Sequence, residues 1–290
     1  MTDHSTTGQW QPLGRVSPTE LIEPRLQLHR AAQVVSGFGT TYGEHADDFS
    51  HTSLEWLGVE RMLAGQPTQS NPPLRLTLDL GGFALGVWVQ ETEVGRFTLD
   101  GHSLDDAYEW VEQTVHTVFG ADVVKRLERP DVPTPLGPGL DGTPFAFAPP
   151  EAFVELSKWF GDAALVLQGV ASKEPAASQV RCWPHHFDIA VLIPLDVDEH
   201  GETARSIGVG MTPGDDSYPE PYWYVLPWPR PNGTPSPLPV GSWRTEGWYG
   251  AVITARDVIS RRDGDRQHST VEEFVRHAIA ASRRLLGERI

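Results

Sequence analysis

Residues 74–90 read LRLTLDLGGFALGVWVQ and carry the clearest secondary-structure pattern in the chain. Leucines at every second position alternate with polar or charged residues, which is the period of two expected of a half-buried strand. The pair Gly81-Gly82 then marks a turn, and the apolar run from Phe83 predicts a second strand. The pattern therefore predicts a hairpin of an antiparallel sheet with one apolar face.

Apolar spacing and capping residues predict the helices on either side of this hairpin. We expect the first helix to end at Gly37 and Gly39, because glycine commonly terminates a helix. Helices are predicted after Ser17, over 54–63, from Ser103 to Gly120, from Pro150, and after a capping box of Ser269 and Glu272. Further strands are predicted at 96–99, 179–183, 187–195, 205–211, 222–227 and 248–255.

These elements predict an α+β fold of antiparallel sheets with helices packed on one face of each. The segment 131–150 is rich in proline and glycine and has no periodicity, so we interpret it as a linker. It would separate an N-terminal half, residues 1–130, from a C-terminal half, residues 151–290. The similar order of elements in the two halves is compatible with a duplication, although their sequences are not visibly alike.

Charge and cysteine content restrict the classes of partner and compartment. The 290-residue chain has 39 acidic and 23 basic residues and a formal net charge of -16, so we expect neither nucleic acid nor membrane as a partner. Cys182 is the single cysteine, which excludes an internal disulfide and a zinc site of several thiolates. With no signal-peptide pattern or membrane-length apolar run, a cytoplasmic location is expected. Composition leaves the oligomeric state open.

The first candidate site lies in WPHHFD, residues 183–188. If this segment enters a strand, alternation places His186 and Asp188 on the same face. An imidazole near a carboxylate can act as a general base with an orienting partner, or the two can be ligands of a divalent metal. We therefore take His186 and Asp188 as candidate catalytic residues, and no strong motif identifies a cofactor.

A second candidate segment, TPGDD at 212–216, is followed by PEPYWYV at 219–225. Together they place acids and aromatic rings around one turn. If this turn lies beside His186, the two segments form an aromatic cleft for a cationic or polyhydroxylated small molecule. The candidate ligand-binding residues are His29, Trp183, His185, Asp215, Asp216, Glu220 and Tyr222.

Each of these residues also has a purely structural interpretation. Paired histidines at a strand entry are commonly hydrogen-bonded structural groups, aspartates after glycine are ordinary turn residues, and Cys182 fits a buried thiol. A different function, protein interaction or scaffolding, is indicated by the proline-rich stretch 227–248, where Trp228 or Trp243 could anchor a partner.

Several of these segments resemble an uncharacterised bacterial group known as domain of unknown function 5996. The similarity rests on W-P-x-H-F-D-x-A from Trp183, T-P-G-D from Thr212, P-E-P-Y-W-Y-V from Pro219, and L-H-x-x-x-Q-x-V from Leu28. It covers about a third of the chain and matches residues 40–150 poorly. The resemblance implies no activity, and it directs attention to His29, Trp183, His186, Asp188, Gly214, Asp215 and Glu220.

Overall fold

The computed structural model describes residues 8–120, 125–130, 143–197 and 203–288, which form two compact units. We call residues 20–157 with 181–187 the N-terminal unit, and residues 1–19 with 158–180 and 188–290 the C-terminal unit. Each unit combines helices with an antiparallel sheet, which confirms the α+β prediction. In the described ranges no helix is both long and apolar enough to span a bilayer.

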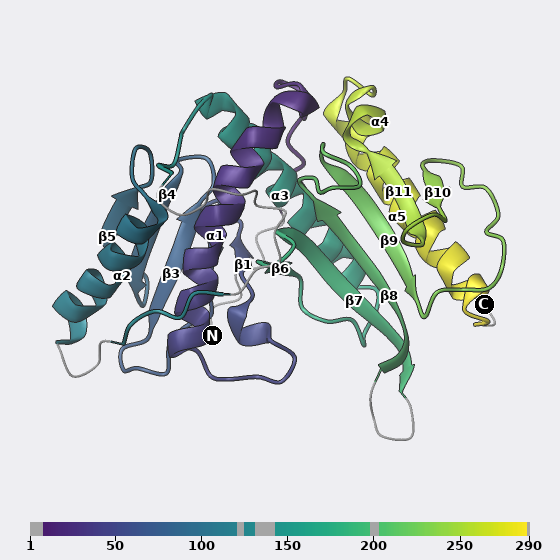
Figure 1. The fold of residues 1–290 in the computed structure, drawn as a ribbon. Helices are drawn as coiled ribbons and strands as arrows, with labels where there is room; N and C mark the ends of the chain where they lie inside the picture. The colour runs from purple at the N-terminus through teal and green to yellow at the C-terminus, as the bar shows by residue number, and fades with distance from the viewer. Residues whose placement is uncertain (1–7, 121–124, 131–142, 198–202, 289–290) are drawn as a thin grey trace. The chain divides into compact units, whose positions relative to one another are not determined.

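The N-terminal unit is a five-stranded sheet in the order β1-β2-β3-β4-β5 with two helices against it. Its helix α1 packs on β3, and α2 contacts both α1 and β5 (Figure 1). The leucines at 74, 76 and 78 are at most 2% exposed, so the alternation does separate a buried from a polar face. The elements are α1 (Ile22–Tyr42), β1 (Glu55–Leu57), β2 (Met62–Ala64), β3 (Leu74–Asp79), β4 (Ala84–Val89), β5 (Thr92–Thr98) and α2 (Leu104–Phe119).

Two local predictions in this unit are wrong. Residues 54–63 were expected to be helical, but β1 and β2 form a hairpin there, because Leu54 bonds to Cys182 of β6 (Arg181–Trp183) and draws the segment into extended structure. Helix α1 also continues through Gly37 and Gly39. A Cβ at either glycine would lie 2.3 Å from a backbone oxygen, so these glycines permit close packing instead of ending the helix.

The C-terminal unit contains the strands β7 to β11 in the order β10-β11-β9-β8-β7. Helix α5 packs along β8, β9 and β11 (Figure 1), and Met211, Trp223, Val225 and Ile253 are fully buried on this side. The elements are β7 (Asp188–Val197), β8 (Thr203–Thr212), β9 (Tyr222–Trp228), β10 (Ser242–Arg244), β11 (Gly250–Thr254), α4 (Ala255–Ile259) and α5 (Gly264–Leu285).

The last helix begins earlier than its predicted capping box. Asp263 is the N-cap and accepts a hydrogen bond from the backbone N–H of Arg266, so Ser269 lies inside the helix. The earlier start places Gln267 at a fully buried position, where its amide bonds to both the N–H and the carbonyl of Leu13. The segment before Thr19 is thereby part of the C-terminal unit.

The division of the chain differs from the predicted 1–130, 131–150 and 151–290. Residues 131–142 of the predicted linker lie outside the described residues, but the following segment is packed, since Phe145 is 2% exposed. Phe145 contacts Phe83 edge to face and bonds through its backbone to Gly101. The unit boundary instead falls at 157/158, within α3 (Pro150–Ala171), whose predicted start at Pro150 is confirmed.

Candidate functional site

The face of the C-terminal sheet opposite α5 gathers several of the predicted site residues. Because side chains alternate along β9, Tyr222 and Tyr224 project from the face opposite the buried Trp223. Strand pairing aligns Ala190, Gly210, Tyr224 and Val252 in one row across it. We call this the tyrosine face; it comprises Asp188, Ala190, Leu192, Gly208, Gly210, Thr212, Tyr222, Tyr224, Leu226, Arg244, Gly250 and Val252.

Tyr224 and Asp188 form a buried pair on this face. The Tyr224 hydroxyl donates a hydrogen bond to Oδ2 of Asp188, and both residues are 9% exposed. The pair depends on Gly210, because a Cβ there would lie 2.4 Å from the Tyr224 hydroxyl. The missing side chain on β8 therefore allows the phenol ring to lie across the neighbouring strand.

Tyr222 and Asp215 form a second phenol–carboxylate pair, 2.5 Å between Tyr222 Oη and Asp215 Oδ2. The other oxygen, Oδ1, accepts the backbone N–H groups of Ser217 and Tyr218 at 2.7 and 2.9 Å. Asp215 is thus both a turn residue, as its structural interpretation predicted, and the acceptor of the tyrosine proton. The turn requires Gly214, whose φ is 126° and whose Cβ would meet the carbonyl of Pro219 at 2.5 Å.

Burial raises the pKa of the Tyr222 phenol far above its usual range, and the hydrogen bond to Asp215 and the charge of Asp188 raise it further. The phenol therefore keeps its proton and acts as a hydrogen-bond donor at any physiological pH. Tyr222 therefore does not supply a tyrosinate nucleophile, and it can offer a ligand only a neutral phenol and an aromatic ring.

Half-buried aromatic rings extend this arrangement at the end of the sheet. Tyr218 and Trp248 both contact the Tyr222 ring, at centroid distances of 4.9 and 6.3 Å. The Trp248 indole N–H donates to the hydroxyl of Ser217 at 3.1 Å, in the same turn that holds Asp215. We call Tyr218, Tyr222, Tyr224 and Trp248 the aromatic cluster; Arg244 lies over two of its rings.

The remaining predicted acids do not join this cluster. Glu220 forms a two-point ion pair with Arg256 at 2.5 and 2.9 Å, which ties the turn to α4. Asp216 is exposed at the surface. Of the three acids predicted around this turn, Asp215 bonds to a ring of the aromatic cluster, whereas Asp216 and Glu220 do not.

The predicted His186–Asp188 face is wrong in its secondary structure. Residues 184–187 form a turn, closed by a 2.7 Å bond from the N–H of Phe187 to the carbonyl of Trp183, and β7 begins only at Asp188. Strand alternation therefore does not apply to His186. His185 and His186 are exposed and in ring contact with each other, and they belong to the N-terminal unit, whereas Asp188 belongs to the C-terminal unit.

The other predicted histidine, His29, fixes this turn by a hydrogen bond to its backbone. His29 Nε2 donates to the carbonyl of Pro184 at 2.7 Å, and the amide of Gln33 donates to the same oxygen at 2.7 Å. The imidazole stacks on Phe187 with an interplanar angle of 10°. Burial, with a smaller effect from the positive charge of Arg25, lowers the pKa of His29 to about 4, so its role is that of a neutral structural donor.

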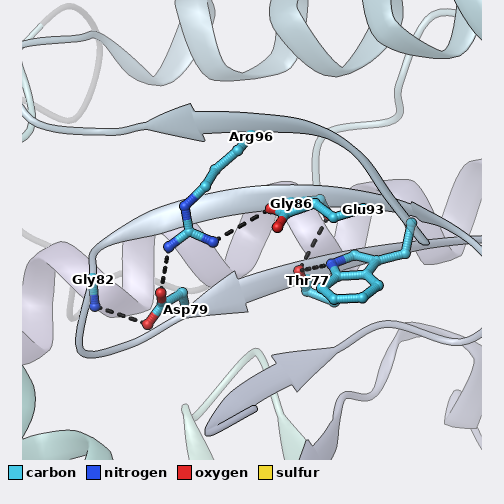
Figure 2. A network of polar contacts seen from close by, with 7 residues as sticks. Thr77, Asp79, Gly82, Gly86, Glu93 and Arg96 are labelled. Carbon is cyan, nitrogen blue, oxygen red and sulfur yellow. Dashed lines mark hydrogen bonds and ion pairs between the residues drawn. The ribbon is translucent and has the colours of Figure 1, made fainter. Parts of the chain in front are cut away.

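The N-terminal unit has a polar network that the sequence did not reveal (Figure 2). Arg96 bridges Asp79 at 2.5 Å and Glu93 at 3.3 Å, and the Trp88 indole donates to Thr77 at 3.1 Å. The alternation of β3 indicated only that its polar residues share a face. Because Asp79 and Glu93 both pair with Arg96 inside the network, we interpret it as a structural feature of that sheet.

No group of three or more His, Cys, Asp and Glu side chains suited to a metal ion occurs among the residues with described positions. Comparison of the chain with protein-family models, curated proteins and solved structures gave no match.

Proposed function

We propose that the C-terminal unit binds a small ring-shaped molecule on the aromatic cluster. The observation that carries the proposal is that half-buried rings pack on two phenol–carboxylate pairs, one buried and one part-buried. Tyr222 and Tyr224 are 4% and 9% exposed and are held by Asp215 and Asp188. Rings fixed in this way lose little further conformational freedom when a ligand stacks on them.

The contact surface is supplied by the partly exposed members of the cluster. Tyr218 and Trp248 are half-buried, and each is oriented by the Asp215 turn. Aromatic side chains of this kind stack on flat ligands and on the apolar faces of sugar rings. Since the Tyr222 proton is committed to Asp215, binding is better supported than nucleophilic catalysis.

Saturation-transfer NMR on the full chain tests this proposal with three neutral ring probes, namely benzyl alcohol, nicotinamide and D-glucose. We expect transfer to at least one probe, lost in Trp248→Ala. Trp88→Ala is a matched control, because Trp88 is also half-buried and its indole also donates to a hydroxyl at 3.1 Å. Absence of transfer to every probe, or equal loss in both variants, would contradict the proposal.

The resemblance to the uncharacterised bacterial group also stands as a proposal. Its support is that two of the similar segments meet in the N-terminal unit, where His29 and Gln33 bind the same carbonyl of Pro184. Sequencing of relatives provides the test, since His29, Gln33 and Pro184 should vary together if the contact defines a family.

Protein interaction is a second candidate function, favoured by one observation. Trp228, at the end of β9, is 63% exposed. The stretch 227–248 was expected to lack regular structure, but it includes β10, and Trp243 donates to the carbonyl of Ser236. Trp228 is thus the more exposed of the two candidate anchors, and Trp228→Ser should abolish the capture of any partner by the full chain. A partner retained by Trp228→Ser would argue against this function.

A further inference from the structure

Arg244 lies in the aromatic cluster, and none of the residues that the structure describes accepts a hydrogen bond from it. Its guanidinium carbon is 5.4 Å from the ring centroids of both Tyr218 and Trp248. Its Nε is buried without a hydrogen-bond partner, and within the described ranges no carboxylate pairs with it. Aromatic rings attract a guanidinium ion but do not satisfy its N–H donors.

This situation differs from that of four other arginines of the unit. Arg205, Arg256 and Arg283 each pair with a carboxylate. Arg230 also lies over a ring, 5.7 Å from the Tyr249 centroid, but it donates to a backbone carbonyl at 2.7 Å. A half-buried cation without an acid is unusual in a chain with 39 acidic residues, because unpaired buried donors are unfavourable.

We propose that Arg244 recognises an anionic group of the ligand, so that the ligand is a ring compound bearing a carboxylate or a phosphate. This inference rests on the proposed binding function of the aromatic cluster. The planar guanidinium group matches the two oxygens of either anion and forms stronger hydrogen bonds with them than with neutral acceptors. Stacking fixes the guanidinium in place before the ligand arrives.

The surrounding residues support an anion at this position. Asp188 of the tyrosine face and Asp215 of its turn each accept a tyrosine hydroxyl, and neither forms an ion pair with Arg244. Gly247 passes beside the guanidinium without a side chain, since a Cβ there would lie 3.4 Å from Nη2. The Nη groups of Arg244, for which the described residues supply no acceptor, are therefore the donors that an anion would meet.

Isothermal titration of the full chain with benzoate, phenyl phosphate and neutral benzyl alcohol tests the proposal. We expect at least one anion to bind at least about tenfold more tightly than benzyl alcohol, and this preference to disappear in Arg244→Gln. Arg230→Gln should retain it, because Arg230 lies over a different ring. The two anions compared with each other distinguish a carboxylate from a phosphate ligand.

Equal binding of the anions and benzyl alcohol to the wild type would overturn the role of Arg244. If that common binding were lost in Trp248→Ala, the proposed function would stand; binding of no probe would count against both. A second readout uses the wild type and does not depend on the folding of Arg244→Gln. The Arg244 Nε–H resonance is assigned by its absence from the spectrum of Arg244→Lys. It should shift when the anion that binds more tightly is added to the wild type. A resonance that does not move would refute the inference.

Discussion

Acidification should destabilise the N-terminal unit through His29. This imidazole is 5% exposed, and burial lowers its pKa to about 4, from 6.5 in the unfolded chain. Between pH 6.5 and pH 4 the unfolded chain takes up the proton and the folded chain does not. The free energy of unfolding therefore falls as the pH falls through this window. Above it neither state is protonated at His29, and below it both are.

The size of the effect follows from the gap between the two pKa values. A gap of about 2.5 corresponds to about 3 kcal/mol, since one pKa unit is worth about 1.4 kcal/mol. Protonation itself leaves the bond to Pro184 possible, because Nε2 carries its hydrogen in both forms. The loss comes from placing a charge where α1, Phe187 and Arg25 leave no acid to pair with it.

Urea unfolding at pH 7.5, 6.5, 5.5 and 4.5 measures this effect when the wild type is compared with His29→Gln. The glutamine can donate to Pro184 but does not titrate, so the two proteins should converge, or cross, as the pH falls. Carboxylates that titrate in the same window are common to both and cancel in the difference. His45→Gln is the control, because the His45 side chain is 74% exposed. A difference between wild type and His29→Gln that stays constant from pH 7.5 to 4.5 would refute the reasoning.

Three further substitutions test packing and capping. Gly210→Ala should destabilise the protein by about 1–3 kcal/mol in urea unfolding, because the new Cβ would lie 2.4 Å from the Tyr224 hydroxyl. Gly208→Ala should have little effect, because the atom nearest to its new Cβ is 3.8 Å away. Equal losses of unfolding free energy in the two variants would contradict this reasoning. Gly86→Ala should cost a similar amount, because three polar atoms of the network in Figure 2 lie within 3.0 Å of the new Cβ; an unchanged melting temperature would refute it. Ser103→Ala should lower the free energy of unfolding by about 1 kcal/mol through loss of its capping box, and Ser103→Asp, which preserves a cap, should not.

The sequence predicted those parts of the fold that depend on short-range pattern. The β3 alternation, the cap at Ser103 and the start of α3 at Pro150 all involve residues within one or two turns of each other. Predictions failed where a distant backbone decided the outcome. Gly37 was expected to end a helix, yet what matters there is the carbonyl of Glu128, which the local sequence does not specify.

The candidate site shows the same limit. Asp215 and Tyr222 are seven residues apart and were both selected, since the turn brings them together locally. Tyr224 was counted among the aromatic rings of the turn but was not selected as a binding residue, because its partner Asp188 lies 36 positions away and its space depends on Gly210. Arg244 was missed as well, since it gave no motif; a lone arginine beside Trp248 in an acidic chain was the available signal.

The discontinuous units set an order of events during synthesis on the ribosome. All segments of the N-terminal unit have been translated once residue 187 is made, so this unit can finish folding while the C-terminal unit still lacks β7 to β11 and α5. Leu13 is made before the N-terminal unit, but its partner Gln267 is made 254 positions later. In a nascent chain stalled before Gln267, the segment around Leu13 should therefore be cleaved readily by protease. Once α5 has been synthesised and has left the ribosome, this segment should be protected.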